Sequence, residues 1–535
     1  VGASGGGGGG RGGGYLKLNI PLTMMSEKIA IHINDTHPAL CVSELMRLLL
    51  DDHDLPWEQA WAITVKVMSY TNHTIMAEAL EKWPIDLFKE VIPRNYQIIE
   101  EIDRRYLEEY AEVHEAALLN RTRIIIDGQV HMAHLAIIGS HSVNGVAKLH
   151  SDLLKSVVLH DFYLIFPERF NNKTNGIAQR RWMQLANQPL SKVLDMTIGK
   201  SWRHNPQDLQ LLKNYQEDPT VLQRLADAKL TNKQALAEYI QQTTGIEVDP
   251  TAIFDVQIKR LHAYKRQLLN VMHILKLYFD LKDDPQAPIH PRVFIFGAKA
   301  APSYHYAKAI IKVINEVANL INHDPTINDK LKVVFLENYN VTLAERIIPA
   351  ADVSEQISLA SKEASGTSNM KLMLNGAVTI ATLDGANIEI RDAIGDENIA
   401  IFGLTEEEVY AYYAQQNYSA YAFYEEDPVL QRVVNAFIDG TIPNIEREGR
   451  EVFDSLLKYN DEYFLLKDFK SYCDAQYRVD LAYKDQQRWQ AISLMNIANA
   501  GKFSADYTVQ NYADDIWQIE PLYAHVKEPN SASLT

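Results

Sequence analysis

Hydrophobic positions from residue 176 onward follow two alternating periods, one typical of strands and the other of helices. Apolar side chains recur at the three- and four-residue spacing of a buried helix face over residues 268–277 and 307–320. Short, continuous apolar runs predict strands over residues 253–258, 293–297, 331–336 and 377–383. This alternation predicts an α/β fold, in which a parallel sheet is covered by helices on both faces.

The first 175 residues are less periodic and predict more helix than strand. We place a domain boundary near Asn175, which divides the chain into residues 15–175 and 176–535. Residues 1–14 are nearly all glycine and have almost no side chain to bury, which predicts a disordered tail or an artificial addition. The clearest elements before the boundary are helices over 42–50 and 100–115 and short strands over 29–33 and 123–126.

Composition and charge restrict the partners of such a protein. A chain of 535 residues is too long for one core and fits two large domains. Its net charge of −17 argues against nucleic acid or an anionic membrane as the main partner and favours a neutral substrate. Only Cys41 and Cys473 are present, which excludes a disulfide framework and indicates a reducing cytoplasm. No apolar run approaches the roughly 18–20 residues that cross a bilayer.

The most informative motif is EASGTSNMKLMLNG, residues 363–376, in which small residues lead into an apolar helical turn with one lysine. Backbone N–H groups at such a turn favour an anion, and Lys371 follows directly. An amine beside an anion site can bind a phosphorylated aldehyde covalently. The alternative is a solvated lysine after an ordinary helix cap. The residues that would offer N–H groups are Ser365, Gly366, Thr367 and Ser368.

A second motif places four cations at the junction between the predicted strand 253–258 and the helix that follows it. Lys259, Arg260 and Lys265 lie where cations oppose the helix dipole and need anions nearby, whereas Arg266 suits a solvated helix start. Because the carboxyl ends of parallel strands form the usual ligand crevice, Tyr339, which follows strand 331–336, belongs to the same edge.

Three polar segments earlier in the chain are further candidates. Residues 171–182 read as a turn before a helix, and the alternative is a plain interdomain linker. Residues 32–38 and 70–74 contain His37 and His73, which could ligate a metal or serve as hydrogen-bonded structural histidines. No spacing such as HExxH supports the metal.

The run EASGTSNMKLMLNGAVTIATLDGANIEI, residues 363–390, closely resembles the pyridoxal-phosphate signature of the α-glucan phosphorylases, the glycogen, starch and maltodextrin phosphorylases. The segments above and residues 337–352 resemble the same family in the same order, from about residue 28 to the C-terminus. The resemblance implies two Rossmann-like domains of the GT-B glycosyltransferase type. It also implies that the N-terminal domain is truncated, without the family's glycine-rich phosphate loop. Two departures are Ser368, where the family usually has glycine, and Asn340, where some relatives have arginine.

The resemblance also assigns roles to residues. It implies that Lys371 holds pyridoxal 5′-phosphate, that Lys259 and Lys265 hold the cofactor's phosphate, and that Arg260 and Lys265 contact the substrate phosphate. His73 is implied as the further catalytic residue, and its backbone carbonyl faces the reacting carbon. The implied cofactor contacts also include Trp182, Tyr339, Gly366, Thr367 and Ser368. The implied substrate contacts are Asp35, His37, His73, Asn175, Arg260, Glu363, Ser365 and Gly366.

The activity implied by the resemblance is phosphorolysis of an α-1,4-glucan, such as glycogen or maltodextrin. Inorganic phosphate would yield α-glucose 1-phosphate with retention, and the cofactor would act through its 5′-phosphate. The complete protein is expected to be a cytoplasmic homodimer. A retaining glycosidase would need two carboxylates, and only Glu363 is well placed. A catalytically silent module that binds cofactor or glucan, and a pyridoxal transaminase or decarboxylase, are the other hypotheses.

Overall fold

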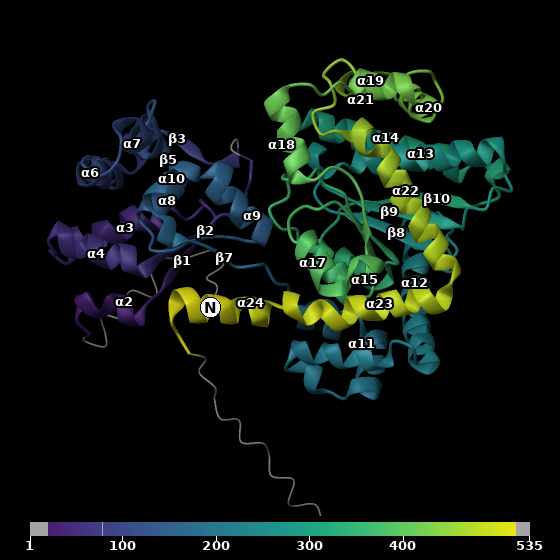
Figure 1. The fold of residues 1–535 in the computed structure, drawn as a ribbon, viewed down its shortest axis with the longest axis horizontal. Helices are drawn as coiled ribbons and strands as arrows, with labels where there is room; N and C mark the ends of the chain where they lie inside the picture. Colours follow the sequence, from purple (N-terminus) through teal and green to yellow (C-terminus); the bar gives the residue numbers. More distant parts are fainter. Residues whose placement is uncertain (1–19, 77–78, 521–535) are drawn as a thin grey trace, which may run out of the picture.

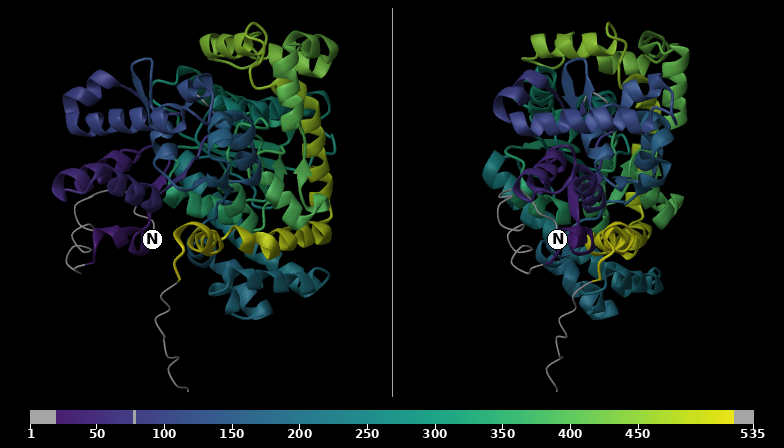
Figure 2. Two further views of the ribbon diagram at one scale, coloured as in Figure 1. Left: turned by 60° about the vertical axis from the view of Figure 1, so that its left-hand side comes forward. Right: turned by 90° about the vertical axis from the view of Figure 1, so that its left-hand side faces the viewer.

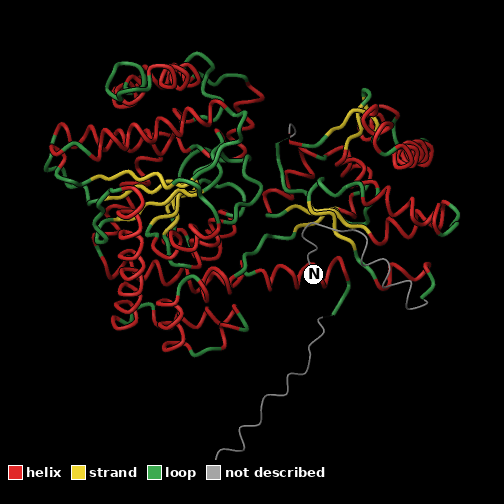
Figure 3. The backbone as a smooth tube through the Cα atoms, turned by 180° about the vertical axis from the view of Figure 1, so that it is seen from behind, coloured by secondary structure: helices red, strands yellow, loops and turns green. Residues whose placement is uncertain are grey.

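The computed structural model describes residues 20–76 and 79–520, and the glycine-rich segment 1–14 lies outside them. The described chain is a mixed α/β protein with two parallel sheets in separate parts of the molecule (Figure 1). In the tube drawing, the strands of each sheet run together through the middle of their part, and helices lie around them (Figure 3). The alternation of periods therefore predicted the fold class correctly.

The larger sheet has six parallel strands in the order β10-β9-β8-β11-β12-β13. The four strands predicted from apolar runs are confirmed, with small changes at their ends. β11 and β13 escaped prediction, β11 because its sequence Val-Ser-Glu-Gln is mostly polar although every residue is buried. The bounds are β8 Ile253–Ile258, β9 Arg292–Gly297, β10 Leu331–Leu336, β11 Val353–Gln356, β12 Val378–Ala381 and β13 Ala400–Ile401.

Helices cover both faces of this sheet because its strands are apolar on both faces. In β8, Ile253 packs with one core, and Phe254 and Val256 point into the other. The first face carries α13 (Gln267–Asp283), α14 (His305–Asn322) and α22 (Leu465–Lys484). The second face carries α12 (Pro219–Thr244), α15 (Val341–Ala350), α16 (Ser368–Leu374), α17 (Asn387–Ile394) and α23 (Gln486–Asn499). Outside these layers lie α11 (Gln188–Ile198), α18 (Glu406–Gln415), α19 (Ala420–Glu426), α20 (Pro428–Asn435) and α21 (Glu446–Leu456).

The smaller sheet has four parallel strands in the order β1-β2-β6-β7, and a separate antiparallel sheet has the order β3-β5-β4. The predicted helix over 42–50 is present, and the helix predicted over 100–115 starts earlier and ends at Tyr110. The strands are β1 Ile31–Asn34, β2 Met68–Thr71, β3 Lys82–Pro84, β4 Ile125–Ile126, β5 Gln129–His131, β6 Val143–Gly145 and β7 Phe170–Asn172. The helices around them are α2 Met25–Lys28, α3 Cys41–Arg47, α4 Trp57–Val67, α5 Ile85–Val91, α6 Pro93–Tyr110, α7 Ala116–Thr122, α8 Met132–Ile138, α9 Lys148–Leu153 and α10 His160–Ile165.

The end of the described chain returns to the smaller sheet. Helix α24 (Ala505–Tyr512) and the short π-helix η13 (Ala513–Trp517) continue from α23 toward the smaller sheet, in yellow in Figures 1 and 2. Trp517 Nε1 donates to His32 Nδ1 at 3.0 Å, and Asn144 Nδ2 donates to the Tyr512 hydroxyl at 3.0 Å. The boundary near Asn175 stays a prediction. Among residues 20–76 and 79–520, no helix has both the length and the apolarity that crossing a bilayer requires.

Candidate active site

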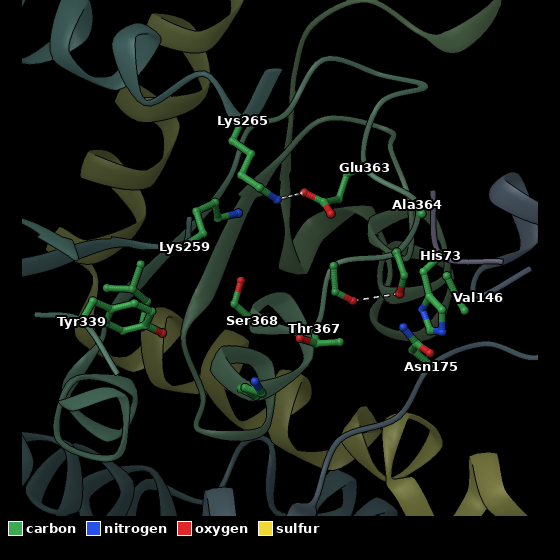
Figure 4. A pocket seen from close by; sticks show the side chains of 14 residues that line it. His73, Val146, Asn175, Lys259, Lys265, Tyr339, Glu363, Ala364, Thr367 and Ser368 are labelled. Atoms are coloured by element: carbon green, nitrogen blue, oxygen red, sulfur yellow. Dashed lines mark hydrogen bonds and ion pairs between the residues drawn. The ribbon is translucent and has the colours of Figure 1, made fainter. Parts of the chain in front are cut away.

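A cavity of about 330 Å³ opens at the carboxyl ends of the strands of the larger sheet. It contains most of the residues that the motifs singled out, brought together from both parts of the chain (Figure 4). Its lining is His73, Val146, Asn175, Ile258, Lys259, Lys265, Tyr339, Glu363, Ala364, Ser365, Gly366, Thr367, Ser368 and Lys371.

Lys371 reaches the cavity from α16, a short helix whose other side is buried. Met370 and Leu372 are almost fully buried in the core shared with α23, and this fixes the direction of the lysine. The ammonium lies 4.6 Å from the centroid of the Trp182 ring, where the aromatic face attracts a cation. Burial lowers the pKa of Lys371. Among the described residues, no carboxylate lies within ion-pair distance of this amine.

Lys259 and Lys265 point into the same space from the segment after β8 (Figure 4). Lys259 Nζ donates to Gln356 Oε1 at 2.8 Å, and Lys265 forms an ion pair with Glu363. Burial, together with the neighbouring ammonium of Lys265, lowers the pKa of Lys259 to about 8. Burial opposes ionisation of Glu363, but the two ammonium groups outweigh it and lower the carboxyl pKa. Glu363 is the one carboxylate among the residues that line the cavity, and Lys265 pairs with it while Lys259 lies near it, so the cavity can take up further negative charge.

The loop 363–368 faces these lysines with its backbone. Gly366 has φ +74°, a conformation that other residues rarely adopt. Among the described residues, the N–H groups of Gly366, Thr367 and Ser368 have no hydrogen-bond acceptor. That they bind an anion stays a prediction of the motif.

Asp384 holds this loop in place, although sequence reasoning assigned it no role. Its carboxylate accepts from the N–H groups of Ser361 and Glu363, both at 2.9 Å, and from the hydroxyl of Ser358 at 2.7 Å. The side chain is 1% exposed. A buried Asp directly after a strand and before Gly was the signal that could have identified it.

The smaller sheet contributes His73 and Asn175 to the cavity (Figure 4). His73 Nε2 donates to Asn34 Oδ1 at 2.6 Å. Burial lowers the pKa of His73, although the nearby carboxylate of Asp35 opposes the shift. Asn175 is held by its backbone N–H, which donates to the carbonyl of Val146 at 2.9 Å.

Tyr339 lines the cavity and packs on Gly297. Four of the predicted site residues do not line it. Trp182 is buried beneath Lys371. Arg260 is exposed, as is His37, and Asp35 is half-buried with φ +62°. Their roles stay predictions.

One expectation was wrong, because Arg266 is not a solvated helix start. Its side chain is fully buried, and Nη1 pairs with Asp468 at 2.7 Å. Nε donates to the carbonyl of Ile357 at 2.8 Å. Local charge pattern could not reveal this, because Asp468 lies 202 positions away in the sequence.

The arrangement defines an α/β protein with a cationic cavity beyond the carboxyl ends of a parallel sheet. The model of the carbohydrate phosphorylase family matches residues 14–519, and the chain belongs to that family. It is 53% identical over 510 residues to the glycogen phosphorylase of Bacillus subtilis strain 168, covering 95% of this chain and 64% of that protein. It is 46% identical to the glycogen phosphorylase of Synechocystis sp. PCC 6803, over 96% of this chain and 61% of the relative. The muscle form of glycogen phosphorylase from Oryctolagus cuniculus is 43% identical, over 94% of this chain and 60% of the relative. The chain thus spans less than two thirds of the length of these relatives.

Proposed function

We propose that this chain carries the catalytic groups of an α-1,4-glucan phosphorylase, which releases α-glucose 1-phosphate from glycogen or maltodextrin with inorganic phosphate. The observation that carries the proposal is the convergence of Lys259, Lys265 and Lys371 on one cavity in a member of the carbohydrate phosphorylase family. Two phosphate groups can lie close together only where several cations offset their repulsion. Relatives named glycogen phosphorylase over 93–96% of the chain support this assignment.

The residues around Lys371 fit pyridoxal 5′-phosphate. No carboxylate in the described part of the chain pairs with the amine, Trp182 offers an aromatic wall, and Tyr339 another. The free N–H groups of the loop 366–368 and the ammonium groups of Lys259 and Lys265 suit the phosphate end. When bound, the cofactor supplies through its 5′-phosphate the proton partner of the substrate phosphate.

The chain's own residues would then hold the second phosphate and the sugar. Lys265, released from Glu363, and Arg260 would bind inorganic phosphate, lysine as a point charge and arginine as a fork. His73 and Asn175 face this space from the opposite wall and would bind the sugar, with Asp35 and His37 behind His73. Asn340 caps α15 by accepting from Leu343 N at 3.0 Å, so it contributes no charge to the site.

We further propose that the two parallel sheets are the cores of the two Rossmann-like domains of a GT-B protein, the first incomplete here. The complete protein would act as a homodimer in the cytoplasm. Phosphate, glucan and glucose 1-phosphate would be its small-molecule and polymer partners.

The test is an assay of the purified chain with phosphate and maltoheptaose while the cofactor absorbance is recorded. Lys371→Ala is expected to lose the cofactor band and all turnover. Arg260→Ala should keep the band and lose at least about tenfold in phosphate-dependent glucose 1-phosphate release, since a charge-assisted contact is worth roughly 1.5–3 kcal/mol. Lys458→Ala, which alters an exposed lysine, is the control. Turnover that both active-site variants leave unchanged would refute the proposal, and a band without any turnover would indicate a silent binding module.

A further inference from the structure

One buried asparagine, Asn375, connects the helix that carries Lys371 to the short π-helix that carries Trp182. Asn375 ends α16, and its Nδ2 donates at 2.9 Å to the carbonyl of Lys371 and at 2.9 Å to the carbonyl of Trp182. One carboxamide therefore holds both residues of the amine–aromatic contact by their backbones. Asn375 is 1% exposed, so water cannot replace either bond.

The acceptor side of Asn375 is fixed as well. Asn187 Nδ2 donates to Asn375 Oδ1 at 2.9 Å, and Asn187 Oδ1 in turn accepts from Asn232 Nδ2 at 2.9 Å. Lys229 Nζ donates to the backbone carbonyl of Asn375 at 2.9 Å. Because both donors and the acceptor of the Asn375 amide are used, its orientation has no alternative.

We propose that Asn375 is a positioning residue that sets the place of the Lys371 amine over the Trp182 ring, an inference that rests on the proposed function of Lys371. Asn375 is not among the residues that line the cavity. It acts by joining the last turn of α16 to the short π-helix η6 (Arg180–Leu185), two elements that lie far apart in the sequence. Without it, two buried carbonyls lose their donor, and the elements can separate.

The chain offers a matched control for the test. Asn496 lies in α23, is fully buried, and also donates through Nδ2 to the carbonyl four residues earlier, Ile492, at 3.0 Å. Its second acceptor is the carbonyl of Asn398 at 3.2 Å, away from the cavity. Asn496→Ala therefore removes the same two kinds of donor bond as Asn375→Ala, although only Asn375 also accepts a bond through Oδ1, and it leaves the contact between Lys371 and Trp182 in place.

The first measurement is the affinity of the full chain for pyridoxal 5′-phosphate, followed by the absorbance of the bound form. Asn375→Ala is expected to weaken binding about tenfold or more and to shift the band, because a misplacement of about 1 Å at a reacting group has such effects. Asn496→Ala should stay within about twofold of the wild type at a similar fall in thermal midpoint. If Asn375→Ala behaves like Asn496→Ala in both respects, the proposal is wrong.

The second measurement uses the chain without cofactor and is independent of the proposed function. The rate at which an acylating reagent modifies Lys371 is followed against pH by mass spectrometry, and the midpoint reports the basicity of the amine. Burial lowers this pKa in the wild type, while Lys259, Lys265, Glu363 and His73 line the same cavity. Asn375→Ala should move the midpoint upward, and an unchanged midpoint would overturn the inference. If Asn375→Ala fails to fold, Asn187→Ala removes the support of the Asn375 amide together with the N-cap of α11 and the bond from Asn232. It should shift both readouts in the same direction, and its failure to do so also counts against the proposal.

Discussion

At the scale of single residues, the site holds more positive than negative charge out of bulk water. Lys259 is the clearest example, because its pKa of about 8 reflects burial and a neighbouring ammonium. Among the described residues, its one hydrogen-bond acceptor is the neutral amide of Gln356. A bound anion would add to the attraction of the nearby Glu363 carboxylate and would favour the charged form of Lys259. Anion binding and protonation of this amine are therefore linked.

This linkage predicts that affinity for an anion falls as the pH rises through about 8. Sulfate is a suitable probe, because its own charge does not change in this range. Below pH 8 Lys259 is already protonated, and above it binding must take up a proton, so the dissociation constant of sulfate should rise with pH. Calorimetry in buffers of different ionisation enthalpy would measure the uptake. Lys259→Met should bind more weakly with a flatter profile between pH 7 and 9, and an equally steep profile would contradict the assignment.

At the scale of elements, the loop 363–368 takes its shape from tertiary contacts more than from its own sequence. Asp384 binds its backbone from the turn after β12, and Gly385 lies against its carbonyl groups. A Cβ atom at Gly385 would lie 2.6 Å from the carbonyl oxygen of Ser365 and 2.8 Å from that of Glu363. The turn 384–385 therefore fixes the backbone of the loop 363–368.

Gly385→Ala should consequently weaken cofactor and phosphate binding by displacing this loop. The matched control is Gly245→Ala at the end of α12, which has a similar left-handed backbone, φ +74°, but open space around the missing Cβ. Both substitutions cost about 1 kcal/mol of backbone strain. Only Gly385→Ala should raise the dissociation constant of pyridoxal 5′-phosphate several-fold, as measured by absorbance titration. Equal effects of the two variants would show that the loop does not depend on the turn.

Prediction from the sequence succeeded where the information was local. The apolar runs located β8 and β10 to the residue, since strands buried on both faces read as continuous hydrophobic segments. β11 was missed because its buried Ser354, Glu355 and Gln356 are polar and are satisfied by distant partners. The lysines of the cavity lie within two short motifs, whereas Asp384 and Asn375 act through bonds to segments that no local pattern connects.

At the scale of the whole molecule, the cavity is shared between the two sheets. His73 follows β2 and Asn175 follows β7 of the smaller sheet, and the lysines come from the larger one. The end of the chain crosses between them, because α24 follows α23 and Tyr512 reaches the smaller sheet. The predicted cofactor contacts lie within residues 182–371, whereas the smaller sheet provides most of the predicted sugar contacts. A change in the relative placement of the two sheets should thus affect sugar binding more than cofactor binding.

Tyr512→Ala tests this separation. The substitution removes the hydrogen bonds to Thr71 and Asn144 and the edge contact with His32, whose ring centroid lies 5.1 Å away. A loss of about 1–3 kcal/mol is expected, visible as a lower thermal midpoint. Tyr507→Ala, on the same helix with a side chain that is 45% exposed, should cost less than about 0.5 kcal/mol.

In Tyr512→Ala the affinity for pyridoxal 5′-phosphate should stay within about twofold, because Lys371 and Trp182 keep their bonds through Asn375. The KM for maltoheptaose should rise several-fold, because His73 no longer faces the lysines at a fixed distance. If both affinities fall in parallel, the cofactor site also depends on the smaller sheet, and if neither falls while the midpoint does, the contact of Tyr512 serves stability alone.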